Sequence, residues 1–250
     1  MRLFVPPDEL SGEAVTIEGE GHRHLARSLR AAVGDAVTVF DGRGTEIEAR
    51  IERVGRRATV LSLGRRRVAT TAPEVDITLL QGLARGDRMD AIVQKTTELG
   101  VARIVPVITL RSAPAAAAAT AARLRRWLTI AREAARQSER ADVPAILPPV
   151  PLADALARPL SDPTDVLRLA LWEESRGPGL GDHLERVRSD KTPPPVILLV
   201  GPEGGFAVEE IDGARAAGFT VASLGRRVLR VETAAMVAVA LVQAAAGGLG

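Results

Sequence analysis

From Val75 onward, apolar runs of strand length alternate with segments of helical periodicity, and this alternation limits the possible folds more than any other feature of the sequence. A strand that is covered on both faces is apolar along its length. Helices that connect such strands place them parallel to one another in one sheet. The sequence therefore predicts an α/β domain, with strands at Val75–Leu80, Ile104–Val107, Val166–Leu171, Val196–Val200 and Thr220–Ser223.

Two of the intervening segments are predicted to be helices. Asp87 stands where a helix cap is expected, and the apolar residues after it repeat at helical spacing until Gly100. The second helix is predicted from Thr120 to about Arg140, after an alanine-rich loop or frayed helix at 113–119. Its core stripe consists of Leu124, Leu128, Ala131 and Ala135. A neighbouring face suits phosphate contacts, although a solvated face with local ion pairs explains it equally well, and it carries Arg125, Arg132, Arg136 and Arg140.

The N-terminal part of the chain shows short strands in place of this alternation. In Glu46–Val54, every second residue from Ile47 to Arg53 shares one face. One helix is predicted at His22–Arg30, and the weakly patterned stretch Val68–Pro73 is the predicted linker. The sequence thus predicts a small, mostly β barrel at 1–71 and a second domain at 74–250. The expected strands of the barrel are Leu3–Val5, Ala14–Ile17, Ala36–Phe40, Glu46–Val54 and Ala58–Leu63.

Arginine dominates the charge of the chain, since 31 of its 33 basic residues are arginines, although the formal net charge is only +2. The segments Gly21–Arg67 and Gln81–Arg140 each carry 11 basic and five acidic residues, whereas the chain after Arg140 carries 10 and 14. Two basic segments suggest that a polyanion lies across both of them. A general bias toward arginine and alanine, such as a GC-rich genome produces, explains the composition equally well.

The sequence also excludes several classes of protein. Cysteine is absent, which removes disulfide frameworks, thiolate zinc sites and cysteine nucleophiles, and we predict no metal site. The first residues, MRLFVPPDEL, lack the apolar core and cleavage site of a secretory signal. The most apolar stretch, Ala234–Ala246, is shorter than the ~20 residues of a membrane-spanning helix. We therefore expect a soluble, cytoplasmic protein without a membrane partner.

The strongest local motif is LLVGPEGGF at Leu198–Phe206, in which a strand runs directly into a loop with three glycines and a proline. Such a loop exposes backbone N–H groups, and the missing Cβ atoms let a ligand approach closely. A cofactor site is expected at the carboxyl end of a strand. The phosphate-loop pattern and the dinucleotide-binding glycine pattern are both missing from this turn. A tight strand-to-helix turn is an equally good interpretation of the motif.

A second glycine-bearing loop follows at Ser223–Ala234, with the sequence SLGRRVLRVETA. It leads from a strand end through a basic stretch into the last apolar helix. Two such loops at neighbouring strand ends are suited to hold one ligand between them.

These two loops resemble the paired cofactor motifs of the RsmE family, which belongs to the SPOUT class of methyltransferases and methylates N3 of a uridine in 16S ribosomal RNA. The resemblance is carried by Gly201–Phe206 and Leu224–Ala234. The segments Gln94–Val101 and Glu133–Arg140 are similar to helices of the same family, and His24–Arg30 is similar to its RNA-binding segment. The similarity extends over nearly the whole chain.

The resemblance implies a small N-terminal PUA-like β-barrel domain that binds RNA and a C-terminal α/β SPOUT domain tied in a trefoil knot. It also implies S-adenosyl-L-methionine as the cofactor, the 16S rRNA of the 30S ribosomal subunit as the substrate, and a homodimer. The apolar helix at Ala234–Ala246 fits a dimer interface, although burial within one monomer satisfies it equally well. Sequence physics alone does not predict the knot, because threaded chains are rare.

The family motifs and the basic pattern assign residues to three roles. The predicted catalytic residues are Arg230 and Glu232. The predicted cofactor-binding residues are Leu171, Leu199, Val200, Gly201, Pro202, Glu203, Gly204, Gly205, Ser223, Leu224, Gly225, Val228, Leu229, Arg230 and Thr233. The predicted RNA-binding residues are His22, His24, Arg27, Arg30, Arg65, Arg66, Arg67, Arg85, Arg88, Lys95, Arg132, Arg136 and Arg140. Glu173 and Glu174 follow the strand that ends at Leu171, near the adenosine-facing segment of the family.

Methylation of uridine N3 requires removal of its proton and correct placement of the nitrogen. Arg230 is suited to stabilise the resulting anion, and Glu232 is suited to accept the proton or to orient the arginine. A clamp that holds the loop against the following helix explains this pair nearly as well. Two other functions stay open: a SPOUT enzyme that acts on a ribose oxygen or on tRNA, and a noncatalytic RNA-binding assembly protein.

Overall fold

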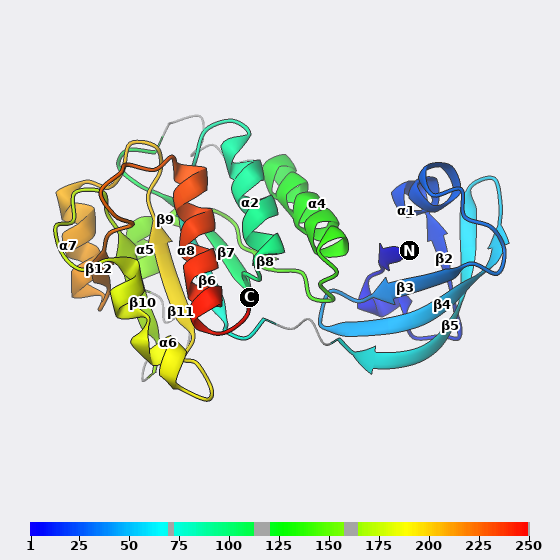
Figure 1. Cartoon of the computed structure of the whole chain (residues 1–250). Coiled ribbons are helices and arrows are strands. Elements are labelled where there is room, and N and C mark those ends of the chain that lie inside the picture. Colours follow the sequence, from blue (N-terminus) through cyan, green and yellow to red (C-terminus); the bar gives the residue numbers. More distant parts are fainter. Residues whose placement is uncertain (70–72, 113–120, 158–164, 250) are drawn as a thin grey trace. The chain divides into compact units, whose positions relative to one another are not determined.

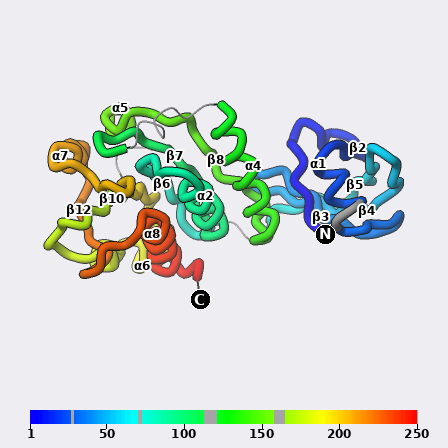
Figure 2. Tube along the Cα trace, turned by 90° about the horizontal axis from the view of Figure 1, so that it is seen from above, coloured from blue at the N-terminus to red at the C-terminus, as the bar shows by residue number. Residues whose placement is uncertain are grey.

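The computed structural model describes residues 1–69, 73–112, 121–157 and 165–249, except for the side chains of residues 27 and 28. The chain forms two compact units. The first contains Met1–Ala72 together with Arg132–Val143, and the second contains Pro73–Ala131 together with Pro144–Gly250. Each unit has a sheet of its own, shown as a cartoon in Figure 1 and as a Cα trace in Figure 2.

The first unit is a curled sheet of five strands in the order β1-β3-β4-β5-β2. Strands β1 and β3 run parallel, and the remaining pairs are antiparallel. The helix predicted at His22–Arg30 is present as α1 (Gly19–Arg23) and the π-helical turn η2 (His24–Ser28). A 3₁₀ turn, η1 (Pro7–Glu9), precedes β2. The predicted strands are confirmed as β1 (Arg2–Phe4), β2 (Ala14–Glu18), β3 (Ala36–Phe40), β4 (Thr45–Val54) and β5 (Ala58–Val68).

Alternate side chains of β4 point into the core of this unit. Ile47, Ala49 and Ile51 are buried together as predicted. Arg53 is exposed, because the pairing of β4 with β5 shifts register between Ile51 and Arg53. Strand β5 extends to Val68, so the predicted linker begins inside a strand. Residues 70–72 of that linker lie outside the described residues.

The segment Arg132–Val143 packs on the first unit, which the sequence did not predict. Ala135 and Ala141 join Phe40 and Ala69 in a small buried cluster, and Phe4 packs against it. The Gly44 N–H donates to the Ala141 carbonyl at 3.1 Å. Helix α4 (Ala121–Gln137) therefore ends before Arg140, and Glu139 adopts φ 61°. Both Thr120 and the alanine-rich stretch 113–119 lie outside the described residues.

A buried carboxylate ties three strands of the first unit together, because Glu46 on β4 pairs with Arg2 on β1 and Arg67 on β5. Glu46 accepts hydrogen bonds from Arg2 and from Arg67 Nε, the latter at 2.9 Å. Burial by itself raises the pKa of Glu46, but the hydrogen bonds and charges of the two arginines outweigh it and lower that pKa. Stabilisation by this ionised group is present above the unfolded-state pKa, and it is lost as the pH falls through the folded-state pKa.

We therefore expect Glu46→Gln to lower the free energy of unfolding by about 1–3 kcal/mol at neutral pH. On acidification the variant should also lose less stability than the wild type, because it lacks the carboxyl group whose pKa is lowered in the folded state. Urea denaturation between about pH 6 and about pH 3 measures both effects. Glu48→Gln is the matched control, since Glu48 is exposed on the same strand. Parallel acid profiles for wild type and Glu46→Gln would contradict this assignment.

The second unit contains an all-parallel sheet in the order β12-β10-β11-β6-β7-β8, with β9 also paired to β7. The five predicted strands are confirmed, with ends shifted by up to two residues, as β6 (Ile77–Gly82), β7 (Arg103–Ile108), β10 (Leu167–Leu171), β11 (Val196–Val200) and β12 (Thr220–Ala222). The short strands β8 (Ala145–Ile146) and β9 (Val150–Pro151) were not predicted.

Helices cover both faces of this sheet (Figure 2). On one face, α2 (Arg88–Glu98) packs against α8 (Val231–Ala245), and α8 contacts β11 and α6 (Glu185–Ser189). On the other face, α5 (Leu152–Ala157) and α7 (Val208–Ala216) enclose a core that includes Leu80, Leu199 and Phe206. A 3₁₀ turn, η3 (Leu180–His183), precedes α6. Strands β6 and β11 are buried along their whole length, which explains their continuous apolar sequence.

The carboxyl ends of the central strands meet at one edge of the sheet. Val200 on β11 is in register with Gln81 on β6 and with Leu171 on β10. Leu171 is in turn in register with Ala222 on β12. The loops that follow β10, β11 and β12 therefore begin beside one another.

Candidate active site

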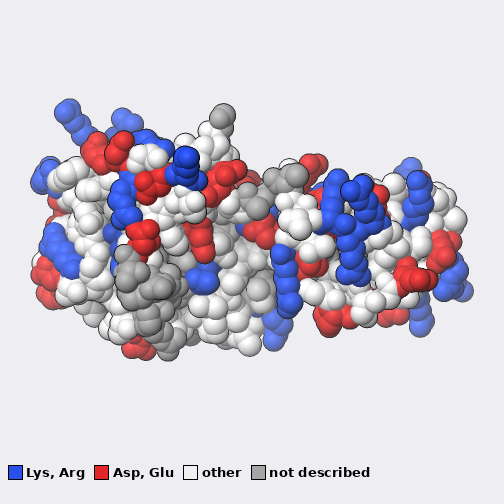
Figure 3. All heavy atoms as spheres, turned by 90° about the horizontal axis from the view of Figure 1, so that it is seen from below, with Lys and Arg blue, Asp and Glu red and all other residues white. Residues whose placement is uncertain are grey.

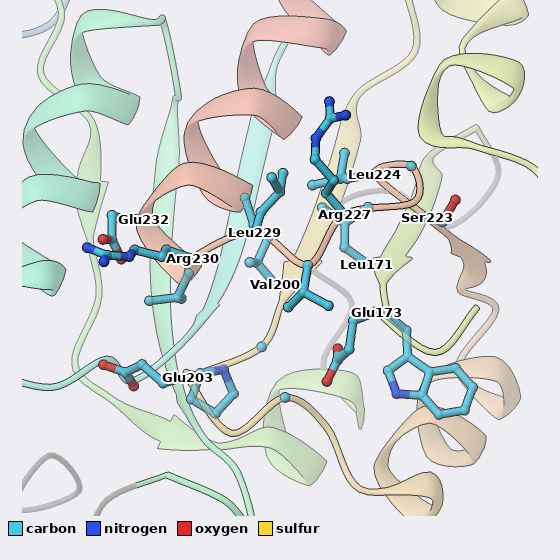
Figure 4. Close-up of a pocket in the computed structure, with 18 of the residues that line it drawn as sticks. Leu171, Glu173, Val200, Glu203, Ser223, Leu224, Arg227, Leu229, Arg230 and Glu232 are labelled. Carbon is cyan, nitrogen blue, oxygen red and sulfur yellow. The ribbon is translucent and has the colours of Figure 1, made fainter. Parts of the chain in front are cut away.

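A cavity of about 470 Å³ lies at this edge of the sheet. Its walls come from the loops after β10, β11 and β12, the first turn of α8, and one residue of α2 (Figure 4). The lining residues are Arg88, Leu171, Trp172, Glu173, Val200, Gly201, Pro202, Glu203, Gly205, Ser223, Leu224, Gly225, Arg226, Arg227, Val228, Leu229, Arg230, Val231, Glu232 and Ala234.

The glycine-rich loop after β11 packs closely on the end of β6. A Cβ at Gly82 would lie 2.4 Å from the Pro202 nitrogen and 2.7 Å from the Gly201 carbonyl carbon. The buried Gln81 amide donates to the carbonyls of Gly82 and Gly201, at 3.0 and 3.3 Å. Gly82 therefore lets the two backbones touch, and Gln81 joins them. Neither residue was predicted from the sequence to belong to the site, because neither lies in the glycine motif.

Glu203 fastens the same loop to the start of α2. Its Oε1 accepts the Arg85 backbone N–H at 2.8 Å and Arg88 Nη1 at 2.7 Å. Burial raises the pKa of Glu203, but the Arg85 N–H and Arg88 outweigh it, so this pKa is lowered. The pKa of Arg88 is raised, first by its hydrogen bond to Glu203, and the charge of Glu232 adds to the effect. The pair thus stays ionised at neutral pH.

The loop after β12 forms the facing wall. Ser223 is held at its base, because its carbonyl accepts the Leu180 N–H at 2.8 Å and its own N–H donates to the Pro178 carbonyl at 3.3 Å. Gly225 adopts φ +97°, a conformation that side chains rarely allow. The apolar side chain of Leu229 lies beside Val200, and that of Leu224 lies nearer to Leu171 (Figure 4).

The segment after β10 closes the cavity opposite Arg230. Figure 4 shows the carboxylate of Glu173 pointing into it. A Cβ at Gly205, which has φ +66°, would lie 1.9 Å from Glu173 Oε1. Trp172 also lines this wall, but its ring packs against the core under α5 and α7, with the Arg215 guanidinium 5.8 Å from the ring centroid. The cavity therefore offers a carboxylate acceptor at this side.

Arg230 and Glu232 lie at the other side of the cavity, with Glu203 near them (Figure 4). Arg230 immediately precedes α8, and Glu232 is in the first turn of that helix. Glu232 Oε2 is buried without a hydrogen-bond partner among the described residues. A cationic and an anionic side chain thus face one space, with apolar side chains between them and Glu173.

Comparison with known proteins identifies the family. The family model for the RNA methyltransferase domain matches residues 71–243, and the model for the RNA methyltransferase PUA domain matches residues 17–63. The ribosomal RNA small subunit methyltransferase E of Synechocystis is 32% identical over 248 residues, which cover 97% of this chain and 77% of that protein. The chain belongs to the RsmE family of RNA methyltransferases. The Bacillus subtilis protein of the same description is 28% identical and matches 91% of this chain and 88% of that protein.

Two solved structures resemble this RsmE-family methyltransferase along nearly its whole length. A methyltransferase from Legionella pneumophila with bound SAM superposes with a TM-score of 0.85 at 32% identity, covering 98% of this chain and 97% of that one. The methyltransferase E from Neisseria gonorrhoeae, bound to S-adenosyl methionine, gives 0.84 at 33% identity, covering 97% and 96%. The predicted α/β SPOUT class and the PUA-like N-terminal domain are confirmed. The trefoil knot stays a prediction.

The cavity of the methyltransferase is lined by all but three of the residues that were predicted to bind the cofactor. Leu199 points to the opposite side of the strand and is buried in the core under α5 and α7. Gly204 packs on Arg111, whose Nη1 donates to its carbonyl at 3.0 Å, and Thr233 lies outside the lining. Residues that line the cavity without having been predicted to bind the cofactor are Arg88, Trp172, Glu173, Arg226, Arg227, Val231, Glu232 and Ala234.

The predicted RNA-binding residues do not share one environment. His22 is buried, and its Nδ1 lies 2.9 Å from Thr59 Oγ1, which is a structural hydrogen bond. Arg140 is only 4% exposed and pairs with Asp142, so the prediction that it projects from an exposed helix face is wrong. His24 is half-buried, whereas Arg30 is exposed with φ 50°. The side chain of Arg27 lies outside the described residues.

Some of the remaining basic side chains are free to contact a ligand, and others form hydrogen bonds or ion pairs with neighbouring residues. Arg65 is exposed, whereas Arg66 donates to the Leu10 carbonyl and Arg67 pairs with Glu46. Arg132 is exposed with its guanidinium 4.7 Å from the Phe4 ring, and Arg85 has an exposed side chain. Two further predicted residues form ion pairs within their own helices, Lys95 with Glu98 and Arg136 with Glu133. Figure 3 shows basic side chains gathered on one face of the N-terminal unit, with carboxylates among them.

The described part of the chain holds no group of three or more histidine, aspartate or glutamate side chains arranged to hold a metal ion. None of its helices has both the length and the apolar character that crossing a membrane requires.

Proposed function

We propose that this methyltransferase transfers the methyl group of S-adenosylmethionine to N3 of a uridine in the 16S rRNA of the small ribosomal subunit. The observation that carries the proposal is the cavity between the two family motifs, with Arg230 and Glu232 at one side of it. Relatives named as small subunit rRNA methyltransferases match nearly the whole chain. Two similar structures hold the proposed cofactor.

The cavity fits a nucleoside cofactor of this kind. Leu171, Val200 and Leu229 offer apolar contacts for an adenine ring, and the glycine-rich backbone lets polar groups approach closely. Glu173 presents a carboxylate that can accept hydrogen bonds from ribose hydroxyls or an ammonium group. We therefore propose that the lining residues predicted from the motifs, together with Glu173, hold the cofactor.

The residues at the other side of the cavity are suited to the chemistry of the base. When bound, S-adenosylmethionine supplies an electrophilic methyl group. Glu232 Oε2, buried and without a partner among the described residues, accepts the proton of uridine N3. Arg230 stabilises the negative charge that the base then carries on its oxygens. The arrangement holds both groups in place before the reaction, which lowers the reorganisation that the step requires.

Several further properties belong to the proposal. We propose that residues 1–71 bind RNA and that residues 74–250 bind the cofactor and catalyse the transfer. Dimer formation through α8 is supported by its apolar residues that stay partly exposed, such as Val237 and Leu241, the latter 40% exposed. A role on the small ribosomal subunit is consistent with a cytoplasmic location.

A methyl-transfer assay tests the function directly. Purified protein is incubated with tritiated S-adenosylmethionine and with unmethylated 30S subunits, free 16S rRNA or tRNA, and the labelled nucleoside is identified. We expect 3-methyluridine in 16S rRNA. Label in a 2′-O-methylated nucleoside or in tRNA would assign a different SPOUT activity, and the absence of both transfer and cofactor binding would indicate a noncatalytic RNA-binding protein.

We expect Arg65→Ala to weaken RNA binding a few-fold and to lower the slope of log affinity against log salt by about 1. The side chain of Arg65 is exposed and forms no ion pair with a carboxylate among the described residues, so its loss removes charge alone. Filter binding at several salt concentrations measures the slope, and calorimetry should show unchanged cofactor affinity. Arg57→Ala is the control, because Arg57 is exposed in the turn between β4 and β5. Equal slopes for Arg65→Ala and wild type would show that Arg65 is a solvent-exposed arginine that does not contact RNA.

A further inference from the structure

Arg88 lies in the wall of the cavity, although the sequence placed it among the arginines that contact RNA phosphates. Its Nη1 donates to Glu203 at 2.7 Å, and 43% of the side chain is exposed. A guanidinium has five N–H donors in one plane, so this ion pair leaves donors available. The Arg85 backbone N–H holds Glu203 in turn. The Arg85 N–H therefore holds the Glu203 carboxylate, and that carboxylate in turn orients the Arg88 guanidinium.

Glu232 brings an acceptor to the same part of the cavity. Its Oε2 is buried and has no hydrogen-bond partner in the part of the chain that is described. A buried oxygen in this state costs free energy until a donor reaches it. Figure 4 shows the carboxylate at the same side of the cavity as Glu203, the partner of Arg88. Both residues line the cavity, and the charge of Glu232 acts on Arg88, so a donor held by Glu203 shares this wall with an acceptor that lacks a donor among the described residues.

We propose that Arg88 and Glu232 together read the base that is methylated and select uracil over cytosine. This inference rests on the proposed function and names the contacts that decide its substrate. Glu232 accepts the N3–H of the base, and Arg88 donates to a carbonyl oxygen next to it. Arg88 is then a specificity-determining residue, and Glu203 is a positioning residue that acts through it.

The Watson–Crick edges of the two pyrimidines explain the selection. Uracil presents an N3–H donor between two carbonyl acceptors, which matches a carboxylate beside a guanidinium. Cytosine presents an N3 lone pair between its O2 carbonyl and an amino group at C4, so acceptor would face acceptor at N3, and donor would face donor because Arg88 contacts the position that is O4 in uracil. A site built from such groups rejects the wrong base, because its own polar atoms stay unpaired. After the N3 proton has passed to Glu232, Arg88 still faces an oxygen that shares the negative charge.

A base contact and a phosphate contact differ in a measurable way. Loss of a phosphate contact weakens binding to all sequences and reduces its salt dependence, whereas loss of a base contact relaxes selectivity at one position. Arg85 supplies the matched control, because its exposed side chain lies outside the lining of the cavity. Arg85→Ala also keeps the backbone N–H that binds Glu203.

The test measures equilibrium binding of 30S subunits that carry uridine or cytidine at the target position, with the protein saturated by S-adenosylhomocysteine. We expect the wild type to prefer uridine, and Arg88→Ala to reduce that preference by about 10-fold to 100-fold. Arg88→Lys, which keeps the charge next to Glu203, should retain the fold and part of the preference. Glu203→Gln should reduce the preference less than Arg88→Ala does. Arg85→Ala should leave the preference unchanged.

Two results would overturn the inference. If Arg88→Ala weakens binding of both substrates equally, Arg88 is a phosphate contact. If Arg88→Ala and Glu203→Gln lose cofactor affinity and melting temperature together while the uridine preference persists, the pair is only a loop clamp. Methyl transfer by the wild type is mapped in parallel. Its absence from uridine N3 would reject the proposed function, whereas transfer with an unchanged preference in Arg88→Ala would reject this inference alone.

Discussion

Replacing Arg230 with alanine is expected to slow single-turnover methyl transfer by about 10²-fold to 10³-fold, while cofactor affinity changes little. The reason is that its charge would act mainly on the anion formed when uridine N3 loses its proton, so the contact is stronger in the transition state than in the ground state. Rapid-quench measurement of transfer to 30S subunits gives the rate. Calorimetry gives the affinity for S-adenosylmethionine.

Two further variants make this result specific. Arg230→Lys should restore the rate only in part, because an ammonium supplies charge without the planar donor geometry of a guanidinium. Arg227→Ala is the matched control, since Arg227 is an exposed arginine of the same loop and points away from Arg230 and Glu232 (Figure 4). Equal losses of rate, cofactor affinity and melting temperature in Arg230→Ala would show that Arg230 only holds the loop.

A single methyl group at Gly82 is expected to have the largest effect of any change outside the motifs. In Gly82→Ala, the new Cβ would lie 2.4 Å from the Pro202 nitrogen and 2.6 Å from its Cδ. Because these atoms belong to backbone and ring, the glycine-rich loop must move away from β6. We expect cofactor affinity to fall at least about 100-fold and the free energy of unfolding to fall by about 1–3 kcal/mol. Calorimetry and thermal denaturation measure the two effects.

The control for Gly82→Ala is Gly213→Ala in the same unit. A Cβ at Gly213, which lies in α7, meets only Leu156 Cδ1 at 3.9 Å. This variant should bind the cofactor normally and gain about 0.5–1 kcal/mol of stability, because alanine restricts the unfolded chain more than glycine does. Normal cofactor affinity in Gly82→Ala would mean that the loop does not depend on this backbone contact.

The sequence by itself predicted the main elements and the place of the site. Continuous apolar runs identified five strands of the second unit, because a strand covered on both faces has no polar side. The glycine-bearing segments Gly201–Phe206 and Ser223–Ala234 directly follow two of these runs. Parallel strands end at a common edge, so both loops were expected to meet there. The register between Leu171, Val200 and Ala222 shows that they do.

Only the tertiary structure decided which distant segments contact one another. Sequence periodicity predicted α4 as far as Arg140, but packing of Ala135 and Ala141 against Phe40 ends the helix early and buries that arginine. The sequence does not distinguish Arg88 from other surface arginines, whereas the structure pairs it with Glu203, which lies far along the chain. Local patterns report which face of an element is apolar and which residues carry charge. They do not report which partner covers that face or neutralises that charge, because this depends on contacts between residues far apart in sequence.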